Sequence, residues 1–544
     1  MANFTNEEVR LLSEFVSDPR GNVFAVFPHK MPGMIGAAYA RYSRARGGLR
    51  ETLLKEFIRA GVLDARHADE LIQRILIVYG DDSVQELESA WLSLEGISNL
   101  ATKVVEDRRL GGYIEQSSRY VFYDQRDEQG RFRYLREPTI MASPYGARYE
   151  AVMDAVFGTY CWLIEPMQEY FRRRKPLEAA EYEIRADRGK MRYADCRDDQ
   201  ERNDFKTTWR FDIRAKACDT IRILLPASTL TNVGMHANGR TFEHMLRHLY
   251  SSDLLEMQQL AVQAHAALNT VIPRYVERAR RSEYLVETRR AMQVLADALL
   301  DRVTPEPAAA VTVTEGSYEW TRQLAAMLYP YSEHSLEQLT QFTRWDISPE
   351  QQWRIYDTYI GNRRTRRDRP GRALEFGYPW FVDLVIDFGI YRDLHRHRML
   401  TQQRQRITTR LGFCEIPEAI VEAGFRSDVE ACAEQSAELY EAVRVDLGSE
   451  VAQYCALFGH NIRCCFAFND REAQHLLELR TGPQGHQGYR RICQEIYRQM
   501  RVVDPVGPLR VERFMKFVDL NDYDWPRADS EARQRAKEAK LGSE

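Results

Sequence analysis

The segments NGRTFEHML (residues 238–246) and NDREAQHLL (469–477) share one pattern, N-x-R-x-x-x-H-x-L, and lie 231 positions apart. A chain of 544 residues is too long for one ordinary hydrophobic core, so two or more domains are expected. Between the two segments, TPEPAAAVTVT (304–314) interrupts a helical run with prolines and alanines before a β-prone stretch. We therefore predict that the chain begins again after this linker as a second copy of the first fold.

The predicted first copy contains two stretches of different character. Apolar residues at three- and four-residue spacing predict mainly helices over 50–120. The stretch 176–215 is highly charged and poorly periodic, and we interpret it as an exposed insertion. The predicted boundaries are 1–303 for the first copy, 304–314 for the linker, 315–530 for the second copy and 531–544 for a charged tail.

The composition excludes several classes of protein. Lys plus Arg (76) nearly balances Asp plus Glu (80), so the net charge of −4 does not favour a polybasic nucleic-acid binder. The nine cysteines form no C-x-x-C pair, and adjacent Cys464 and Cys465 are expected to be buried thiols. No apolar run reaches about 18 residues, and the N-terminus has no basic region followed by an apolar stretch. We expect a cytoplasmic protein without a membrane span.

The densest candidate site is HRHRMLTQQRQR (395–406). Arginine forks donate paired, charge-assisted hydrogen bonds to phosphate oxygens, and an imidazole can donate a hydrogen bond or stack on a planar ring. A solvated basic face is the alternative interpretation. The segment follows the apolar PWFVDLVIDFGIY (379–391), which we predict to be a buried strand that delivers the basic cluster.

Two further segments allow a functional and a structural interpretation. In the helix that opens at Asn469, Arg471 and His475 share one face, whereas Asn469 and Glu472 could form a capping box. In GGYIEQSSRYVFYD (111–124), Ser117 and Arg119 could hold a phosphate together, or the segment could simply begin a strand.

A fourth candidate is the arginine-rich loop 363–372, within NRRTRRDRPGR. Six arginines in such a loop could bind nucleic-acid phosphates, but a solvated loop is the more common role, so nucleic acid is not the expected partner. The sequence contains no G-x-G-x-x-G after a strand, no Walker loop, no H-E-x-x-H and no G-x-S-x-G. A flavin or nucleotide site would therefore have to be built from side chains.

Together these segments resemble the flavin-dependent thymidylate synthase (ThyX) family. Its signature runs RHR-x-x-S, N-E-x-S-x-R-Y, A-R-x-x-L-P and N-x-R-x-x-x-H-x-x-x-L-R, and the two halves of the chain match different parts of it. The second half has QRQRITT in place of N-E-x-S-x-R-Y and Gln453 in place of the A-R-x-x-L-P arginine. Its matches are Arg396, His397, Arg398, Thr401 (for serine), Asn469, Arg471, His475, Leu479 and Arg480.

The first half shows the converse pattern. It has Asp107-Arg108-Arg109 where RHR belongs, and His248-Leu249 where the final Leu-Arg belongs. The polar segment that precedes RHR in the family is not recognisable in either half. The matches of the first half are Glu115, Ser117, Arg119, Tyr120, Arg222, Asn238, Arg240 and His244.

The resemblance implies an α+β fold in two tandem copies, each with a mixed or antiparallel sheet flanked by helices. Family members are homotetramers whose active sites lie between subunits, so a fused pair that forms a homodimer would reproduce that assembly. The implied reaction is the FAD-dependent reductive methylation of dUMP to dTMP, with methylenetetrahydrofolate and NADPH as co-substrates. Two alternatives remain open: a flavoenzyme of the same fold acting on another pyrimidine nucleotide, and a non-catalytic nucleotide- or flavin-binding pseudoenzyme.

The resemblance also implies roles for individual residues, and no metal. Arg480 would face the uracil as the catalytic residue, where its charge could stabilise an anionic pyrimidine. The nucleotide would be bound by Glu115, Ser117, Arg119, Arg222 and Arg480. FAD would be held by Arg396, His397, Arg398, Thr401, Asn469, Arg471 and His475, and in the first copy by Asn238, Arg240 and His244.

Overall fold

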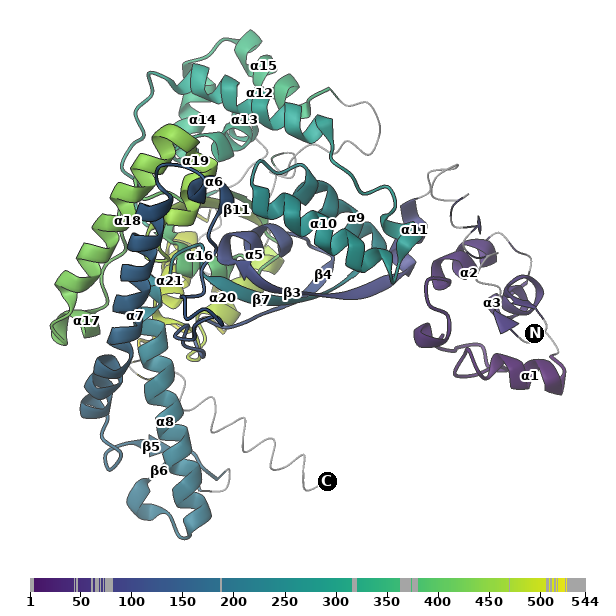
Figure 1. The fold of residues 1–544 in the computed structure, drawn as a ribbon, viewed down its shortest axis with the longest axis horizontal. Coiled ribbons are helices and arrows are strands. Elements are labelled where there is room, and N and C mark those ends of the chain that lie inside the picture. Colours follow the sequence, from purple (N-terminus) through teal and green to yellow (C-terminus); the bar gives the residue numbers. More distant parts are fainter. Residues whose placement is uncertain are drawn as a thin grey trace. The chain divides into compact units, whose positions relative to one another are not determined.

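The computed structural model contains α-helices and antiparallel sheets, which confirms the predicted α+β fold (Figure 1). The helices carry most of the regular structure. The structure describes residues 4–43, 45, 47–59, 62–63, 68, 70–71, 73, 82–185, 188–315, 320–362, 373, 380–468, 470–504, 508, 511–512, 515, 517–523 and 525.

The chain forms two compact units whose limits do not follow the two halves of the sequence. The first unit comprises Met1–Ile97, Val104–Glu115 and Thr231–Val286. The second comprises Ser98–Lys103, Gln116–Leu230 and Glu287–Glu544. A long segment of the first half, 116–230, therefore packs with the second half of the chain.

The first unit is built on a three-stranded sheet of order β3-β7-β4. Mainly helices were predicted over 50–120, and this is wrong for β3 and β4. In β3 the side chains alternate between exposed and buried over most of the strand, the period-two pattern of a half-buried strand. The elements of this part of the chain are α1 (Asn6–Leu12), α2 (Ile35–Tyr42), α3 (Leu49–Thr52), β1 (Ile58–Arg59), β2 (Val62–Leu63), β3 (Ser89–Ser98), β4 (Gly111–Glu115), β7 (Leu230–Asn238), α9 (Gly239–Tyr250), α10 (Leu255–Asn269) and α11 (Pro273–Val276).

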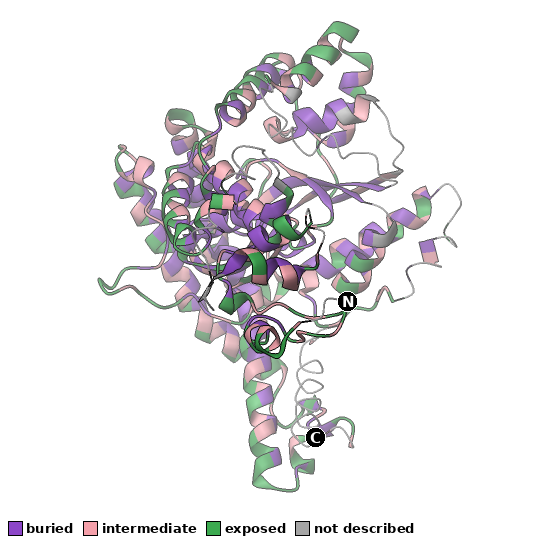
Figure 2. Cartoon of the chain, turned by 90° about the vertical axis from the view of Figure 1, so that its right-hand side faces the viewer, coloured by how far each residue is buried: buried purple, intermediate pink, exposed green. Residues whose placement is uncertain are grey.

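The second unit has an antiparallel sheet of order β10-β11-β9-β8. The apolar segment 379–391 contains β9, in which most residues are buried, so the predicted buried strand is confirmed. Buried residues are purple in Figure 2, where strands in the upper half carry this colour. The strand ends at Asp387, whose side chain accepts a hydrogen bond from the Ile390 amide and caps the next helix. The sheet elements and that helix are β8 (Val311–Glu315), β9 (Trp380–Asp387), α16 (Phe388–Leu394), β10 (Thr401–Arg404) and β11 (Asn461–Phe468).

Helices pack against the strands of this sheet. Cys464 and Cys465 of β11 are fully buried free thiols, as predicted. The charged segment 176–215 forms β5, β6 and most of α8, with a small apolar core that includes Tyr182 and Phe205. The remaining elements are α5 (Asn99–Val105), α6 (Pro138–Met141), α7 (Gly146–Arg174), β5 (Glu181–Tyr182), β6 (Met191–Arg192), α8 (Asp199–Ile221), α12 (Glu283–Leu300), α13 (Trp320–Leu328), α14 (Leu336–Trp345), α15 (Pro349–Ile360), α17 (Glu418–Glu422), α18 (Arg426–Leu447), α19 (Ser449–Ala452), α20 (Asp470–Arg480) and α21 (Gln487–Val503).

The order of elements repeats along the chain. Strands β3, β4 and β7 are ordered β3-β7-β4, and their counterparts β9, β10 and β11 are ordered β9-β11-β10. A helix follows directly on the first strand and on the last strand of each set: α5 and α9 in the first half, α16 and α20 in the second. No helix of the described residues is both long and apolar enough to cross a membrane.

Within the second unit, equivalent segments of the two halves meet in a short antiparallel contact. Pro226 bridges Leu457, the Ala227 amide donates to the Ala456 carbonyl over 2.7 Å, and the Phe458 amide donates to the Leu225 carbonyl over 2.8 Å. Leu225, Ala227, Ala456, Leu457 and Phe458 are all fully buried. Helices α7 and α18 pack against each other in the same unit. The two halves are therefore joined by backbone hydrogen bonds inside a dry core.

We predict that Leu457→Ala weakens this contact. Truncating a fully buried leucine removes apolar contacts and leaves a cavity, so the free energy of unfolding should fall by about 2–5 kcal/mol. Urea unfolding followed by circular dichroism measures the change. Val445→Ala, on the exposed side of α18, is the matched control and should change the value by no more than about 0.5 kcal/mol. Equal effects of the two substitutions would contradict a buried joint.

Candidate functional site

The basic segment 395–406 begins at the end of α16, not at the end of a strand. The prediction that β9 delivers it directly is wrong, because Asp387 caps a helix that separates the two. His395, His397 and Thr401 are buried, whereas Arg396 is exposed. Arg398 is half-buried. The segment is therefore not a uniformly solvated basic face.

A buried ion pair links the two halves of the sequence within the second unit. Arg222, at the end of α8, donates from Nη2 to Oδ2 of Asp393 on α16 over 3.0 Å. Only 3% and 6% of the two side chains are exposed. Burial alone would raise the pKa of Asp393, but Arg222, Arg119, Arg396 and Arg480 together hold it far below its usual range. Asp393 is thus an ionised carboxylate within a cluster of guanidinium groups.

Arg119 joins the same cluster through α8 and α21. Its guanidinium donates from Nε to Oδ1 of Asp219 over 3.1 Å and from Nη1 to the Tyr489 hydroxyl over 3.2 Å. Burial lowers the pKa of Arg119, but Asp219, Tyr489, Asp393 and Tyr120 together outweigh burial and raise the pKa above the usual arginine value. Next to Arg119, the Ser118 hydroxyl accepts a 3.2 Å hydrogen bond from Nη1 of buried Arg392.

Arg480, at the end of α20, completes the cluster. Its Nε donates to Nε2 of His397 over 2.7 Å. Its guanidinium carbon lies 5.3 Å from the centre of the Tyr489 ring, and that of Arg119 lies 5.3 Å from the same ring. Tyr489 is therefore a shared contact of two arginines from different halves of the chain.

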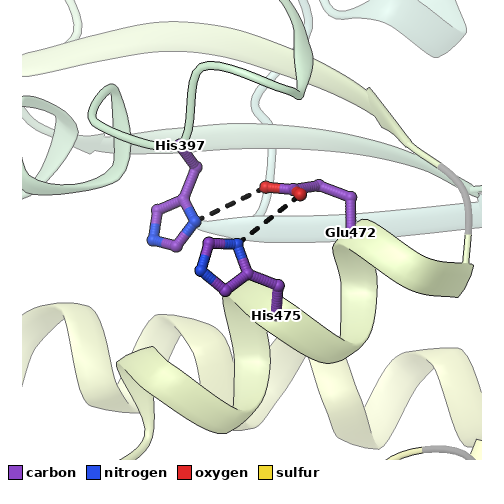
Figure 3. A group of neighbouring side chains, drawn as sticks. All are labelled: His397, Glu472 and His475. Atoms are coloured by element: carbon purple, nitrogen blue, oxygen red, sulfur yellow. Dashed lines mark ion pairs between the residues drawn. The ribbon is translucent and has the colours of Figure 1, made fainter. Parts of the chain in front are cut away.

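A second group of side chains, Glu472 and His475, lies next to His397. Oε1 of Glu472 lies 3.5 Å from Nδ1 of His397, and its Oε2 lies 3.6 Å from Nδ1 of His475 (Figure 3). Burial lowers the pKa of His397 to about 4, with Arg480 acting in the same direction and Glu472 against it. His397 is therefore neutral near pH 7.

Six of the residues predicted from the sequence lie in the second unit, and contacts around Asp393 and His397 link all of them except Ser117: Ser117, Arg119, Arg222, His397, His475 and Arg480. The Ser117 hydroxyl accepts from the Arg119 amide over 3.2 Å, a local turn contact. Arg396, Arg398 and Thr401 lie in the same unit. At Gln453, in place of the family arginine, the side chain accepts from the Ile407 amide instead.

Other predicted residues lie in the first unit or outside the described residues. Glu115, the last residue of β4, lies in the first unit. There Asn238 caps α9 by accepting from the Thr241 amide, Arg240 pairs with Glu86, and Nε2 of His244 lies 3.1 Å from Nε2 of His248. Asn469, the Arg471 side chain, the arginine-rich loop 363–372 and the tail 531–544 lie outside the described residues.

The sequence did not indicate Asp219, Asp393 or Tyr489 as site residues. It also did not indicate the contact between Glu472 and His397. Asp393 stands three residues before Arg396, and Asp219 stands one helical turn before Arg222, so both were close to recognised motifs. Their partners come from the other half of the chain or from residues 100 positions away. No local pattern indicates such pairs.

We predict that Asp393→Asn destabilises the second unit. The substitution removes the charge that compensates buried Arg222, and breaking one side of a buried ion pair costs about 3–5 kcal/mol. The free energy of unfolding in urea measures the loss. Asp346→Asn, at the exposed end of α14, is the matched control and should change it by less than about 0.5 kcal/mol. A loss no larger than that of the control would mean that Asp393 is not the buried counterion.

Comparison with known proteins agrees with this arrangement. The profile of the thymidylate synthase complementing protein family matches residues 30–274 and 311–506, one segment in each half. A UPF0159 protein of Chlamydia muridarum is 33% identical over 98% of this chain and 99% of its own length. Similar proteins occur in Chlamydia pneumoniae (33% identical, 98% of each chain) and Thermoplasma acidophilum (28% identical, 92% of this chain and 98% of the relative). The chain belongs to the thymidylate synthase complementing protein (ThyX) family, as a member with two tandem copies.

Proposed function

We propose that this protein is an FAD-dependent enzyme of the thymidylate synthase type. It would methylate dUMP reductively to dTMP, with methylenetetrahydrofolate as the one-carbon donor and NADPH as the reductant. The observation that carries the proposal is the arginine cluster around Asp393, in which Arg119 and Arg222 of the first half meet Arg480 of the second half. Motifs that are incomplete in each half alone are complementary there.

The cluster suits the phosphate of a nucleotide. The guanidinium groups of Arg119, Arg222, Arg392, Arg396 and Arg480 outnumber the carboxyl groups of Asp219, Asp387 and Asp393. The positive charge that remains favours a dianionic ligand, and each guanidinium fork can donate paired hydrogen bonds to phosphate oxygens. We assign Ser117, Arg119 and Arg222 to the nucleotide phosphate, with Asp219 and Asp393 fixing the directions of the arginines.

The residues after α16 fit the requirements of FAD. Exposed Arg396 and half-buried Arg398 are cationic donors of the kind that a pyrophosphate needs, and His397 offers an imidazole beside them. Thr401 and His475 belong to the same set, which Asn469 and Arg471 complete according to the family pattern. FAD bound there would supply the redox chemistry. The assignment of Asn238, Arg240 and His244 to a second cofactor site in the first copy remains a prediction, as does that of Glu115 to the nucleotide.

Arg480 is assigned to the pyrimidine ring. Its guanidinium is held from one side by His397 and from another by the face of Tyr489. A fixed positive charge in a site with little water stabilises negative charge that develops on the ring, and no reorganisation is needed during the reaction. This chain would therefore contribute binding, orientation and electrostatic stabilisation.

One observation favours a second candidate, a nucleotide- or flavin-binding protein without catalysis. In the first half, Asp107 stands at the position of the first RHR arginine, so that copy lacks the matching cofactor motif. Turnover assays distinguish the candidates: the protein converts dUMP, converts another pyrimidine nucleotide, or converts neither. We propose further that the protein forms a homodimer in the cytoplasm.

The visible absorption spectrum of the purified protein tests the proposal. With FAD added, the flavin bands should shift when dUMP is added and bleach when NADPH follows; dTMP should then form with methylenetetrahydrofolate. Flavin binding without any dTMP would support the non-catalytic candidate, or an enzyme for another nucleotide if a different pyrimidine nucleotide shifts the bands. A protein that takes up no FAD would refute the flavoenzyme proposal.

We predict that two arginine substitutions have different effects. Arg119→Ala removes a charged donor to the phosphate and should weaken dUMP binding by roughly 10- to 100-fold. Arg480→Ala should lower kcat by about 10²–10³ with a smaller change in dUMP affinity. Isothermal titration and steady-state kinetics separate the two. Arg426→Ala, on the exposed side of α18, is the control and should match the unmodified protein in both.

A further inference from the structure

The contact between Arg480 and His397 determines the tautomer of this histidine. An arginine side chain has only donors, so the Nε2 atom that receives the 2.7 Å hydrogen bond must present a lone pair. A neutral imidazole carries one proton, and His397 is buried and neutral near pH 7. The proton of His397 is therefore on Nδ1.

Glu472 is the group placed to accept that proton. Nδ1 of His397 is buried and makes no short hydrogen bond to any described residue, and Oε1 of Glu472 lies 3.5 Å from it. The Glu472 side chain is 12% exposed and comes from α20, the helix that ends at Arg480. The sequence suggested only a capping role for Glu472. In the structure it lies between two histidines, with one carboxylate oxygen near each (Figure 3).

The same three side chains also have the composition of a metal site, since their ligand atoms lie within 4.8 Å of one another. Coordination through Nδ1 of His397 would require the lone pair on Nδ1 and the proton on Nε2. The Nε2–H group of His397 would then face the Nε–H group of Arg480, so that two donors would meet without an acceptor. The metal ion and the Arg480 guanidinium would also repel each other across the ring. A histidine that binds a metal usually donates its other N–H to a carboxylate, carbonyl or water, which Arg480 is not. The geometry therefore favours the hydrogen-bonded arrangement without a metal.

We propose that Glu472 is a positioning residue: it holds His397 in the Nδ1–H tautomer, and His397 thereby holds Arg480 through Nε2. Without the carboxylate, the Nε2–H tautomer becomes available, and it repels the Arg480 guanidinium. The link from Glu472 to the tautomer rests on the contacts of the two ring nitrogens of His397 and does not depend on the proposed function. The link from Arg480 to catalysis rests on the proposed function.

Nitrogen-15 NMR of the full chain, labelled at histidine, tests the first link without any substrate or flavin. His397 is assigned by the loss of its signals in His397→Asn. We expect a protonated Nδ1 and an unprotonated Nε2 in the unmodified protein, and the Nε2–H form as the major one in Glu472→Ala. Glu472→Gln should give a mixture, because an amide can donate to Nδ1 or accept from it. Glu478→Gln, on the same helix, should keep the Nδ1–H form.

An Nε2–H tautomer in the unmodified protein would overturn the proposal, whether or not the variants fold. An unchanged Nδ1–H tautomer in a folded Glu472→Ala would do the same. Addition of Zn²⁺ tests the metal alternative. If micromolar Zn²⁺ shifts the His397 and His475 signals, and Glu472→Ala abolishes that shift, the three side chains form a cation site and the positioning role is overturned.

Activity tests the second link. Once dUMP turnover is established, Glu472→Ala should lower kcat by about tenfold or more with little change in the KM for dUMP, and Glu472→Asp should restore part of it. Glu478→Gln should match the unmodified protein. If the tautomer changes as expected but the protein turns over no dUMP, the proposed function fails and the positioning role stands. If kcat is unchanged while the tautomer shifts, Arg480 does not depend on His397 for its role.

Discussion

The buried ion pair between Arg222 and Asp393 is the interaction on which the arrangement of the candidate site depends. Each partner comes from a different half of the sequence, and both are almost completely shielded from water. A charge in such a place is tolerated only when a counterion and hydrogen bonds compensate it. The pair therefore ties the end of α8 to α16 and brings the basic segment after α16 close to the arginines of the first half.

The short antiparallel contact between 225–227 and 456–458 makes this pairing possible. Equivalent positions of the two copies meet there. The segments that form this contact follow a few residues after the ends of α8 and α19. The residues beside this contact differ between the two copies. Arg222 is charged and paired with Asp393, whereas Gln453 at the matching position accepts a backbone hydrogen bond. In a chain with two fused copies, an arginine can be present in one copy and absent from the other. In an assembly of identical subunits, every copy would carry it.

Tyr489 and His397 explain how the arginines can remain close to one another. Like charges repel strongly where little water screens them, so each guanidinium needs a fixed partner. The ring of Tyr489 offers its negative face to Arg119 and Arg480, and the neutral imidazole of His397 accepts from Arg480. The hydrogen bond from Arg480 requires a neutral imidazole, because a protonated one has no lone pair to accept it. The low pKa of His397 meets this requirement.

The repeated N-x-R-x-x-x-H-x-L motif and the apolar segment 379–391 were sufficient to predict the tandem repeat and the buried strand, and the resemblance to the ThyX family implied the α+β fold. The repeat and the strand follow from a recurring motif and from an apolar run, which one chain displays directly. The tertiary structure alone decided that 116–230 packs with the second half, that α16 separates β9 from the basic segment, and that Asp219, Asp393 and Tyr489 are the partners of the arginines. It also decided that Glu472 faces His397. Such contacts join residues tens to hundreds of positions apart, and they depend on side-chain geometry in the folded core that no local pattern encodes.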